Sequence, residues 1–228
     1  RQIHTDYLNL GADIIISNTF WGNRSRMAVA GLGDDWEEYT RLAVEIALAA
    51  RDDSNPEAYV AGGIAPSPGL GDSYEDLRDQ AAVPEDMGVD AILTEYVGSI
   101  AKVRQSIRAA APTGLPLLLG LCHFDEQGRL NMDGGSMADV VEAINDEGVG
   151  VDSILLMCSA PKEISRTMPI LRDVFDGPTG AYANVGYDGA GGGKGDDPDL
   201  QLRGSNIGEN TPKHYARFGQ EWLDMGVQ

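Results

Sequence analysis

Side chains that can hydrogen-bond, ligate a metal ion or titrate close almost every apolar segment of this chain. Each stands at the end of a short, mostly apolar run. The residues are Asn18, Thr19, Glu95, Cys122, His123, Cys158 and Asn184. A thiol and a histidine are metal ligands in many proteins. A carboxylate that closes an apolar run needs a partner, because burying it unpaired is costly.

The segments between these residues alternate regularly between strand and helix. Apolar runs bounded by polar and turn residues predict strands over 12–16, 58–64, 89–94, 115–121, 152–157 and 179–183. Apolar residues at helical spacing, with capping residues at the ends, predict helices over 1–11, 34–50, 72–87, 99–111, 136–147, 161–175 and from 211 onward. This alternation indicates a parallel sheet.

The number of elements favours a (β/α)8 TIM barrel, a fold of the α/β class, over an open doubly wound sheet. A helix precedes the first predicted strand and another follows the last. We therefore expect residues 1–228 to form a single, incomplete barrel domain whose first and last strands are missing from this sequence. The carboxyl ends of barrel strands converge on one mouth, where catalysis takes place, so the polar residues above should meet there.

Length and composition narrow the class of protein. At 228 residues and 42% hydrophobic, the chain can bury one substantial core. Its net charge of −19 argues against nucleic acid or an anionic membrane as a partner, and no apolar run approaches the roughly 20 residues that span a bilayer. Two cysteines make no disulfide framework and fit a reducing, cytoplasmic location. The sequence leaves open whether the protein forms a homo-oligomer.

Five segments resemble the motifs of one family. HTDYLNLGADIIISNTF is similar to a His-x-x-Tyr, Gly-Ala-Asp, Thr-Asn-Thr-Phe block, and GGIAPSPG to a Gly-Pro-rich loop. VDAILTEY resembles a strand that closes on Glu-Thr or Glu-Tyr, MCSAPKEI resembles Asn-Cys-x-x-Pro, and AYANVG resembles Tyr-Pro-Asn-Ala-Gly. Their order and spacing resemble the homocysteine S-methyltransferase family, the zinc-dependent thiol methylases that include betaine–homocysteine methyltransferase and the homocysteine domain of methionine synthase.

The resemblance implies an enzyme that moves a methyl group from an onium or methylcobalamin donor to the thiol of homocysteine, giving methionine. In the family a zinc ion held by cysteine thiolates keeps that thiol deprotonated. Cys158 matches one zinc cysteine, and the other two ligands are expected beyond Gln228. Zinc is therefore expected in the complete protein and not in this chain as it stands. Glu95 matches the acid that holds the substrate's amino group.

The titratable residues also have plainer interpretations. Cys158 could be a buried structural thiol, and Glu95 could pair with a neighbouring arginine or lysine. Cys122 is interpreted as a packing residue at the barrel mouth. His123 is interpreted as a hydrogen-bonded loop histidine, with a role as ligand or base as the alternative.

The neutral residues likewise have a functional and a structural interpretation each. Asn18 and Thr19 could hydrogen-bond a substrate carboxylate or merely cap the next element. Asn184 could line the mouth or form a turn. Trp21 and Tyr96 could form an aromatic wall for an onium methyl donor, or could pack in their loops.

Two alternative functions stay open from the sequence. One is a zinc-independent barrel lyase or aldolase that uses Glu95 and His123, and the other is a non-catalytic barrel that binds a thiol or an amino acid. The glycine-rich run at 189–195 is not a phosphate-binding loop, because the first glycine of G-x-x-x-x-G-K falls on Asp188 and Gly195 replaces the Ser or Thr. Residues 187–210 are expected to form a long loop.

Overall fold

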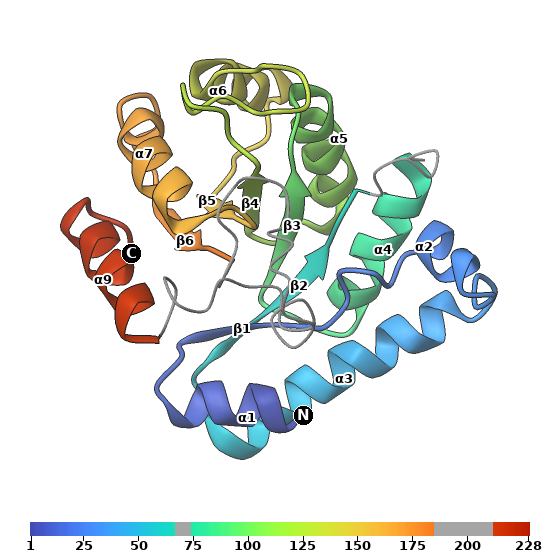
Figure 1. Ribbon diagram of the computed structural model, residues 1–228. Helices are drawn as coiled ribbons and strands as arrows, with labels where there is room; N and C mark the ends of the chain where they lie inside the picture. The colour runs from blue at the N-terminus through green and yellow to red at the C-terminus, as the bar shows by residue number, and fades with distance from the viewer. Residues whose placement is uncertain (67–73, 185–211) are drawn as a thin grey trace, which may run out of the picture.

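The computed structural model describes residues 1–66, 74–184 and 212–228. Within them six parallel strands lie in sequence order across one sheet. The strands are Ile14–Ile16 (β1), Tyr59–Ile64 (β2), Ala91–Val97 (β3), Leu117–Cys122 (β4), Ser153–Met157 (β5) and Thr179–Tyr182 (β6). The sheet curls, and the helices lie around its outside (Figure 1).

One helix precedes β1, and at least one helix follows each of the six strands. The helices are Gln2–Asn9 (α1), Arg24–Val29 (α2), Trp36–Ser54 (α3), Tyr74–Asp86 (α4), Ile100–Ala110 (α5), Met137–Glu147 (α6), Pro161–Arg172 (α7) and Pro212–Asp224 (α9), with a 3-10 turn at Ala111–Thr113 (η1). Strand, helix and strand in unbroken order around a curled sheet is the architecture of a (β/α)8 barrel. The predicted α/β barrel class is confirmed, with six strands in the described residues.

The two faces of the sheet carry different residues because side chains alternate along a strand. The outer face packs against the helices and forms the main apolar core, which includes Val60, Ile92, Leu119 and Ile154. The inner face is smaller and combines alanines with a few large residues. Its cluster consists of Ala61, Ala91 and Leu93, with Ile16, Leu118, Leu155 and Tyr182 packed against it.

The bounds of several segments differ from the sequence prediction, as α3 does by ending at Ser54 and not at 50. β1 is limited to Ile14–Ile16, and the polar stretch after it, for which no helix was predicted, contains a short helix, α2. Asn23 starts α2 by accepting a hydrogen bond from the backbone N–H of Arg26, a cap that periodicity alone does not reveal. β3 extends to Val97 and not to 94.

The extension of β3 contains a β-bulge. Glu95 and Tyr96 together lie opposite the single residue Gly120 of β4, and Tyr96 has a left-handed backbone with φ of 61°. A bulge kinks a strand and re-aims the side chains that it carries. Glu95 therefore lies within the strand, and not after it.

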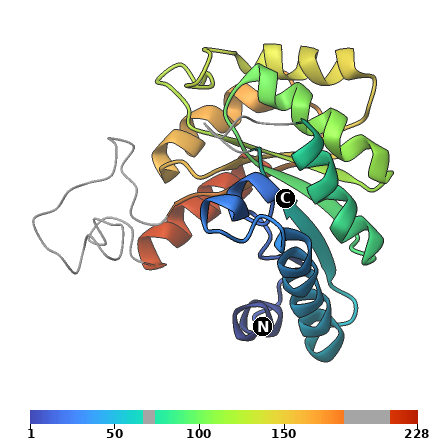
Figure 2. The ribbon, with the colours of Figure 1, turned by 90° about the vertical axis from the view of Figure 1, so that its right-hand side faces the viewer.

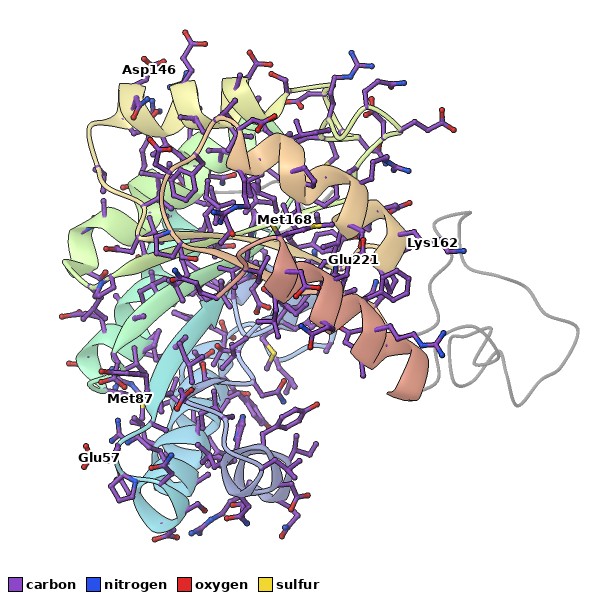
Figure 3. The ribbon with its side chains drawn as sticks, turned by 90° about the vertical axis from the view of Figure 1, so that its left-hand side faces the viewer. Glu57, Met87, Asp146, Lys162, Met168 and Glu221 are labelled. Atoms are coloured by element: carbon purple, nitrogen blue, oxygen red, sulfur yellow. The ribbon has the colours of Figure 1, made fainter. Side chains whose placement is uncertain are left out.

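Helices at the two edges of the sheet pack in pairs. α1 packs against α3 beside β1 (Figure 2), and there Leu8 is buried while Ile3 and Tyr7 are exposed. At the other edge α9 packs against α7, in the region where Met168 and Glu221 are labelled (Figure 3). Trp222 donates a hydrogen bond from Nε1 to Ser165 Oγ at 2.9 Å across this pair.

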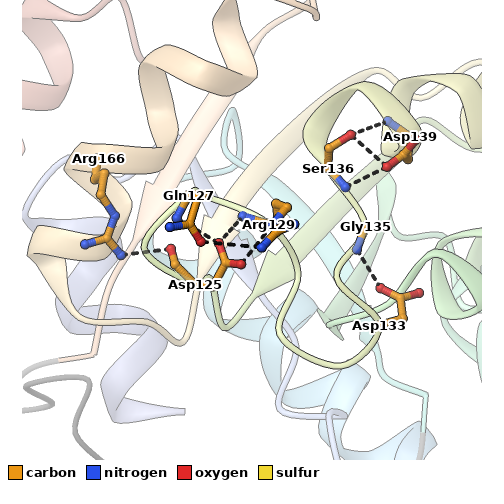
Figure 4. Close-up of polar contacts among 8 residues, drawn as sticks. All are labelled: Asp125, Gln127, Arg129, Asp133, Gly135, Ser136, Asp139 and Arg166. Carbon is orange, nitrogen blue, oxygen red and sulfur yellow. Dashed lines mark hydrogen bonds and ion pairs between the residues drawn. The ribbon is translucent and has the colours of Figure 1, made fainter.

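The polar segment between β4 and α6 is an ordered loop (Figure 4). Asp125 accepts hydrogen bonds from the backbone N–H groups of Gln127 and Arg129, both at 2.9 Å. Ser136 and Asp139 form a capping box at the start of α6, at the residue where the sequence predicts that this helix begins.

Two predictions concern residues outside those described. They are the proline-rich loop beyond Pro66 and the glycine-rich loop at 187–210. No helix in the described part of the chain is long and apolar enough to cross a membrane.

Candidate functional site

The predicted site residues of β3, β4, β5 and β6 lie at the carboxyl ends of four neighbouring strands. Cys122 of β4 is the sheet partner of Met157, and Met157 is in turn the partner of Tyr182 of β6. Cys158 is the residue after Met157. The convergence expected from the sequence is therefore present on one side of the curled sheet.

Glu95 is the buried carboxylate of this mouth. Its side chain is 8% exposed, and its Oε1 accepts a hydrogen bond from the hydroxyl of Tyr182 at 3.2 Å. Burial raises the pKa of Glu95 to about 7, and the Tyr182 hydrogen bond opposes that rise. None of the ion pairs among the described residues includes Glu95. The plainer interpretation, an ion pair with a neighbouring arginine or lysine, thus finds no partner there.

Two glycines make room for this arrangement inside the barrel. A Cβ atom at Gly63 of β2 would lie 3.0 Å from Glu95 Oε2, and one at Gly120 of β4 would lie 3.1 Å from the Tyr182 hydroxyl and 2.8 Å from Met157 Sδ. Side chains at these positions would displace the groups above them. Glycine at these two positions of β2 and β4 therefore leaves room for the side chains of β3, β5 and β6.

Tyr182 and Met157 were not predicted as site residues. The Tyr182 hydroxyl also lies 3.0 Å from Met157 Sδ, and that sulfur accepts the backbone N–H of Tyr96 at 3.2 Å. Burial raises the pKa of Tyr182, and nearby Glu95 adds to the rise. Its place in AYANVG was a signal for Tyr182, whereas nothing in an apolar run distinguishes Met157 from a core residue.

Cys158 and Cys122 are both free thiols in a poorly solvated environment. Burial raises the pKa of Cys158 to about 11, and the charge of Glu95 adds to the rise. Burial likewise raises the pKa of Cys122 to about 12, with Cys158 as a second cause. Both thiols are therefore protonated at neutral pH unless a cation approaches them.

The ends of β3, β4 and β5 share an unusual backbone conformation. Tyr96, His123 and Cys158 have φ of 61°, 59° and 43°, the left-handed region that residues other than glycine avoid. Surrounding contacts hold two of them, since Tyr96 N–H bonds Met157 Sδ and His123 N–H bonds Ser159 Oγ at 2.9 Å. Strained residues of this kind cluster at functional sites.

Ser159 connects three of the strand ends. Its side chain is fully buried, and its hydroxyl accepts the His123 N–H and donates to the Met157 carbonyl at 2.9 Å. Its own carbonyl accepts the backbone N–H of Asn184 at 3.0 Å. The half-buried Asn184 is thereby fixed at the end of β6, while its predicted contact with a substrate stays a prediction.

A row of aromatic rings leads from His123 to the surface. His123 contacts Tyr96 edge to face at 5.0 Å between ring centroids, Tyr96 contacts Phe20 at 6.0 Å, and Phe20 contacts Trp21 at 5.5 Å. The guanidinium of Arg26 lies 3.9 Å from the centroid of the exposed Trp21 ring. Trp21 and Tyr96, which could form an aromatic wall or pack in their loops, are thus separated by Phe20, and the Trp21 ring already contacts a cation.

His123 is half-buried, and burial lowers the pKa of its imidazole while the charge of Glu163 opposes the change. The hydrogen bonds of Glu95 among the described residues go to Tyr182 and not to His123. The acid–base pair required by the lyase or aldolase alternative is therefore not joined by a hydrogen bond there.

Asn18 and Thr19 lie at the end of β1 in different environments. Asn18 is exposed. Thr19 is buried, and its hydroxyl donates to the carbonyl of Gly63 and contacts the hydroxyl of Ser17 at 2.8 Å. These bonds join β1 to β2, so a contact of Thr19 with a substrate would have to compete with them. Substrate binding by both residues stays a prediction.

Comparisons with known proteins agree with this geometry. The sequence profile of the homocysteine S-methyltransferase family matches residues 1–228. The chain belongs to the homocysteine S-methyltransferase family. The family resemblance inferred from the sequence motifs is confirmed.

Two relatives and one solved structure illustrate the family match. S-methylmethionine–homocysteine S-methyltransferase BHMT2 of Mus musculus is 26% identical over 184 residues, which is 76% of this chain and 46% of that protein. Homocysteine S-methyltransferase 4 of Zea mays is 24% identical over 215 residues, which is 82% of this chain and 63% of that protein. The metallated form of the homocysteine methyltransferase MmuM from Escherichia coli superposes with a TM-score of 0.70 at 19% identity, over 90% of this chain and 76% of that one. The MmuM match supports the barrel fold, and the chain spans about half the length of its mouse relative.

The described residues do not by themselves fit a zinc ion. Catalytic zinc sites take three protein ligands, and no group of three His, Cys, Asp or Glu side chains in residues 1–66, 74–184 and 212–228 could hold a metal. Cys158 is the candidate ligand that lies at the mouth, where its unusual φ turns the chain after β5.

Proposed function

We propose that this protein is a homocysteine S-methyltransferase, which transfers a methyl group from an onium or methylcobalamin donor to the thiol of homocysteine and releases methionine. One observation carries the proposal. A chain whose whole length matches the family profile buries a carboxylate at the barrel mouth without a cationic partner among the described residues. The names of the mouse, maize and bacterial relatives, all homocysteine methyltransferases, support it.

Glu95 is proposed to bind the ammonium group of homocysteine. A buried carboxylate loses hydration that a cationic ligand can replace, and a charge-assisted hydrogen bond is about twice as strong as a neutral one. The ammonium would also keep Glu95 ionised, because a nearby positive charge lowers the pKa of a carboxyl. Asn18, Thr19 and Asn184 are proposed as further contacts of the same substrate.

Cys158 is proposed as one ligand of a zinc ion. A bound zinc ion would supply the positive charge that keeps a substrate thiol deprotonated. The pKa of about 11 for Cys158 supports the need for such a charge, since this mouth disfavours thiolates. The described residues do not complete a zinc site, so we assign no step of the reaction to the metal.

An aromatic row beside these groups is compatible with an onium donor. Tyr96 follows Glu95 directly and contacts both Phe20 and His123, and a cation over an aromatic face gains about 0.5 to 2 kcal/mol. We further propose that residues 1–228 belong to a single barrel domain and that the protein is cytoplasmic, as its free cysteines suggest.

The test is methionine formation from L-homocysteine with four donors in turn: betaine, S-methylmethionine, dimethylsulfoniopropionate and methylcobalamin. Glu95→Gln should lower kcat/KM for homocysteine about 10- to 100-fold, the loss expected for a charged hydrogen bond. Glu57→Gln, which alters an exposed carboxyl just before the amino end of β2 (Figure 3), is the control, since the mouth lies at the carboxyl ends of the strands. Absence of methionine with every donor would reject the proposal.

The metal is tested separately by measuring zinc in the purified protein. Cys158→Ser should remove bound zinc together with activity, whereas Cys122→Ser, a change of the neighbouring thiol, should retain both. Unchanged stoichiometric zinc in the Cys158 variant would contradict the role given to that residue.

A further inference from the structure

The hydroxyl of Tyr182 lies between two acceptors at the carboxyl ends of the strands. It is 3.2 Å from Glu95 Oε1 and 3.0 Å from Met157 Sδ. Tyr182 belongs to β6 and Glu95 to β3, so this contact crosses the inside of the curled sheet. It joins the two strands without backbone pairing between them.

A tyrosine hydroxyl has one proton and can donate it to one acceptor at a time. An ionised carboxylate is the stronger acceptor, and a thioether sulfur is a weak one. When Glu95 is ionised, the proton of Tyr182 therefore points to Oε1. The sulfur of Met157, which accepts the N–H of Tyr96, then packs against the hydroxyl oxygen at 3.0 Å without a hydrogen bond to it.

The remaining carboxylate oxygen is the one that can receive a ligand. Oε2 of Glu95 lies next to Gly63, since a Cβ atom at that glycine would be 3.0 Å from this oxygen. The hydrogen bond described for the Glu95 side chain uses Oε1 alone. The hydrogen bond from Tyr182 thus leaves Oε2 of Glu95 without a hydrogen-bond donor among the described residues.

We propose that Tyr182 is a positioning residue for the amino group of the substrate: it holds Oε1 of Glu95 so that Oε2 accepts the ammonium. This inference rests on the proposed function of Glu95. On this proposal, Glu95 of β3 and Tyr182 of β6 together make the site prefer a thiol that carries an amino group to a thiol without one.

The first test is a double-mutant cycle with Tyr182→Phe and Glu95→Gln. Tyr182→Phe should raise KM for L-homocysteine about 10-fold with little change in kcat, because the lost interaction orients the bound substrate. In the Glu95→Gln background the same substitution should have almost no further effect, since the partner is already changed. Additive losses in the double variant would overturn the inference.

The second test uses 4-sulfanylbutanoate, which is homocysteine without its amino group, as a competitive inhibitor. Its inhibition constant should be the same for wild type and Tyr182→Phe. An equal weakening of homocysteine and of this analogue would show a general structural defect and overturn the positioning role. Tyr215→Phe is the matched control, because the Tyr215 hydroxyl bonds only the backbone of Ala183 among the described residues. This substitution should change neither the KM for homocysteine nor the inhibition constant of the analogue.

Failure of the proposed function can be told apart by a measurement without substrate. In protein labelled with 13C at glutamate carboxyls, Tyr182→Phe should raise the pKa of Glu95, because the lost hydrogen bond favoured its ionised form. If wild type makes no methionine but this change is seen, the pairing stands and the enzymatic proposal falls. If the Glu95 titration is the same in both proteins, Tyr182 does not position Glu95.

Discussion

Glu95 is held in an environment that favours its neutral form. Burial raises its pKa from 4.5 to about 7, more than the Tyr182 hydrogen bond lowers it. The folded protein therefore binds this proton more tightly than the unfolded chain does. Stability from this group is fully present below pH 4.5 and is lost as the pH rises through about 7.

Glu95→Gln should consequently stabilise the protein at pH 8 and leave its stability nearly unchanged at pH 5. At about 1.4 kcal/mol for each pH unit, the upper bound of the gain at pH 8 is about 3 kcal/mol. Urea unfolding at the two pH values measures it, with Glu57→Gln as the exposed control. An equal effect at both pH values would show that ionisation of Glu95 does not destabilise the fold.

The same titration should affect the proposed binding of a cationic substrate. If Glu95 binds the ammonium of homocysteine, kcat/KM should rise with pH through about 7 as the free carboxyl ionises. Glu95→Gln should abolish that limb of the profile. A limb that persists in this variant would belong to another group.

The chemistry at single residues was only partly readable from the sequence. Glu95 and Cys158 could be selected because a polar residue at the end of an apolar run stands out. Met157 could not, because its sulfur accepts the Tyr96 N–H and contacts the Tyr182 hydroxyl only once the fold brings β3 and β6 to it. Ser159 was missed for the same reason, since its partners come from the neighbouring strand end.

At the scale of elements, the loop between β4 and α6 supports the mouth. The backbone N–H of Asn131 bonds the carbonyl of His123 at 2.9 Å, and Asp133 accepts the N–H of Ile100 at 2.7 Å, at the start of α5. The loop therefore ties the strand end that carries His123 to the first turn of the preceding helix. Side chains on a loop held in this way keep a defined position.

Ser136→Ala should destabilise the protein by about 1 kcal/mol, because it removes the hydroxyl that accepts the backbone N–H of Asp139 in the capping box at the start of α6. Thermal unfolding measures the loss. Ser153→Ala is the matched control, since the hydroxyl of the half-buried Ser153 bonds a single carbonyl and caps no helix. If the two substitutions cost the same, the capping box contributes nothing specific.

The order of the elements was predictable, whereas their local irregularities were not. Hydrophobic period and turn residues placed six strands in the correct order. The bulge at Glu95 and Tyr96 has no such signature, because it depends on how β3 pairs with β4 around Gly120. Helix α2 was missed because a short polar helix has too few apolar residues to show a period.

At the scale of the whole molecule, the charge is strongly unbalanced. The chain has 36 acidic and 17 basic residues, a net charge of −19. Ion pairs such as Arg41 with Asp86 lie on the surface, where each contributes about 1 kcal/mol or less. We therefore expect repulsion among the excess carboxylates to outweigh these pairs at low ionic strength.

Raising NaCl from 0.05 to 0.5 M should increase the Tm by roughly 5 °C, which corresponds to about 1 to 2 kcal/mol for a chain of this size. Differential scanning calorimetry at neutral pH measures the shift, and KCl should give the same result if screening is the cause. A Tm that falls with salt would mean that the surface ion pairs outweigh the repulsion.

The left-handed residues at the ends of β3, β4 and β5 have a consequence for protein engineering. Tyr96, His123 and Cys158 are aimed by backbone torsions that cost energy for any residue with a Cβ atom. A designer who transplants only these side chains onto another barrel would point them in the wrong directions. Sequence optimisation for stability alone would favour glycine at these three positions and would remove the side chains of the site. A successful graft must therefore include each strand end together with the loop that holds its backbone.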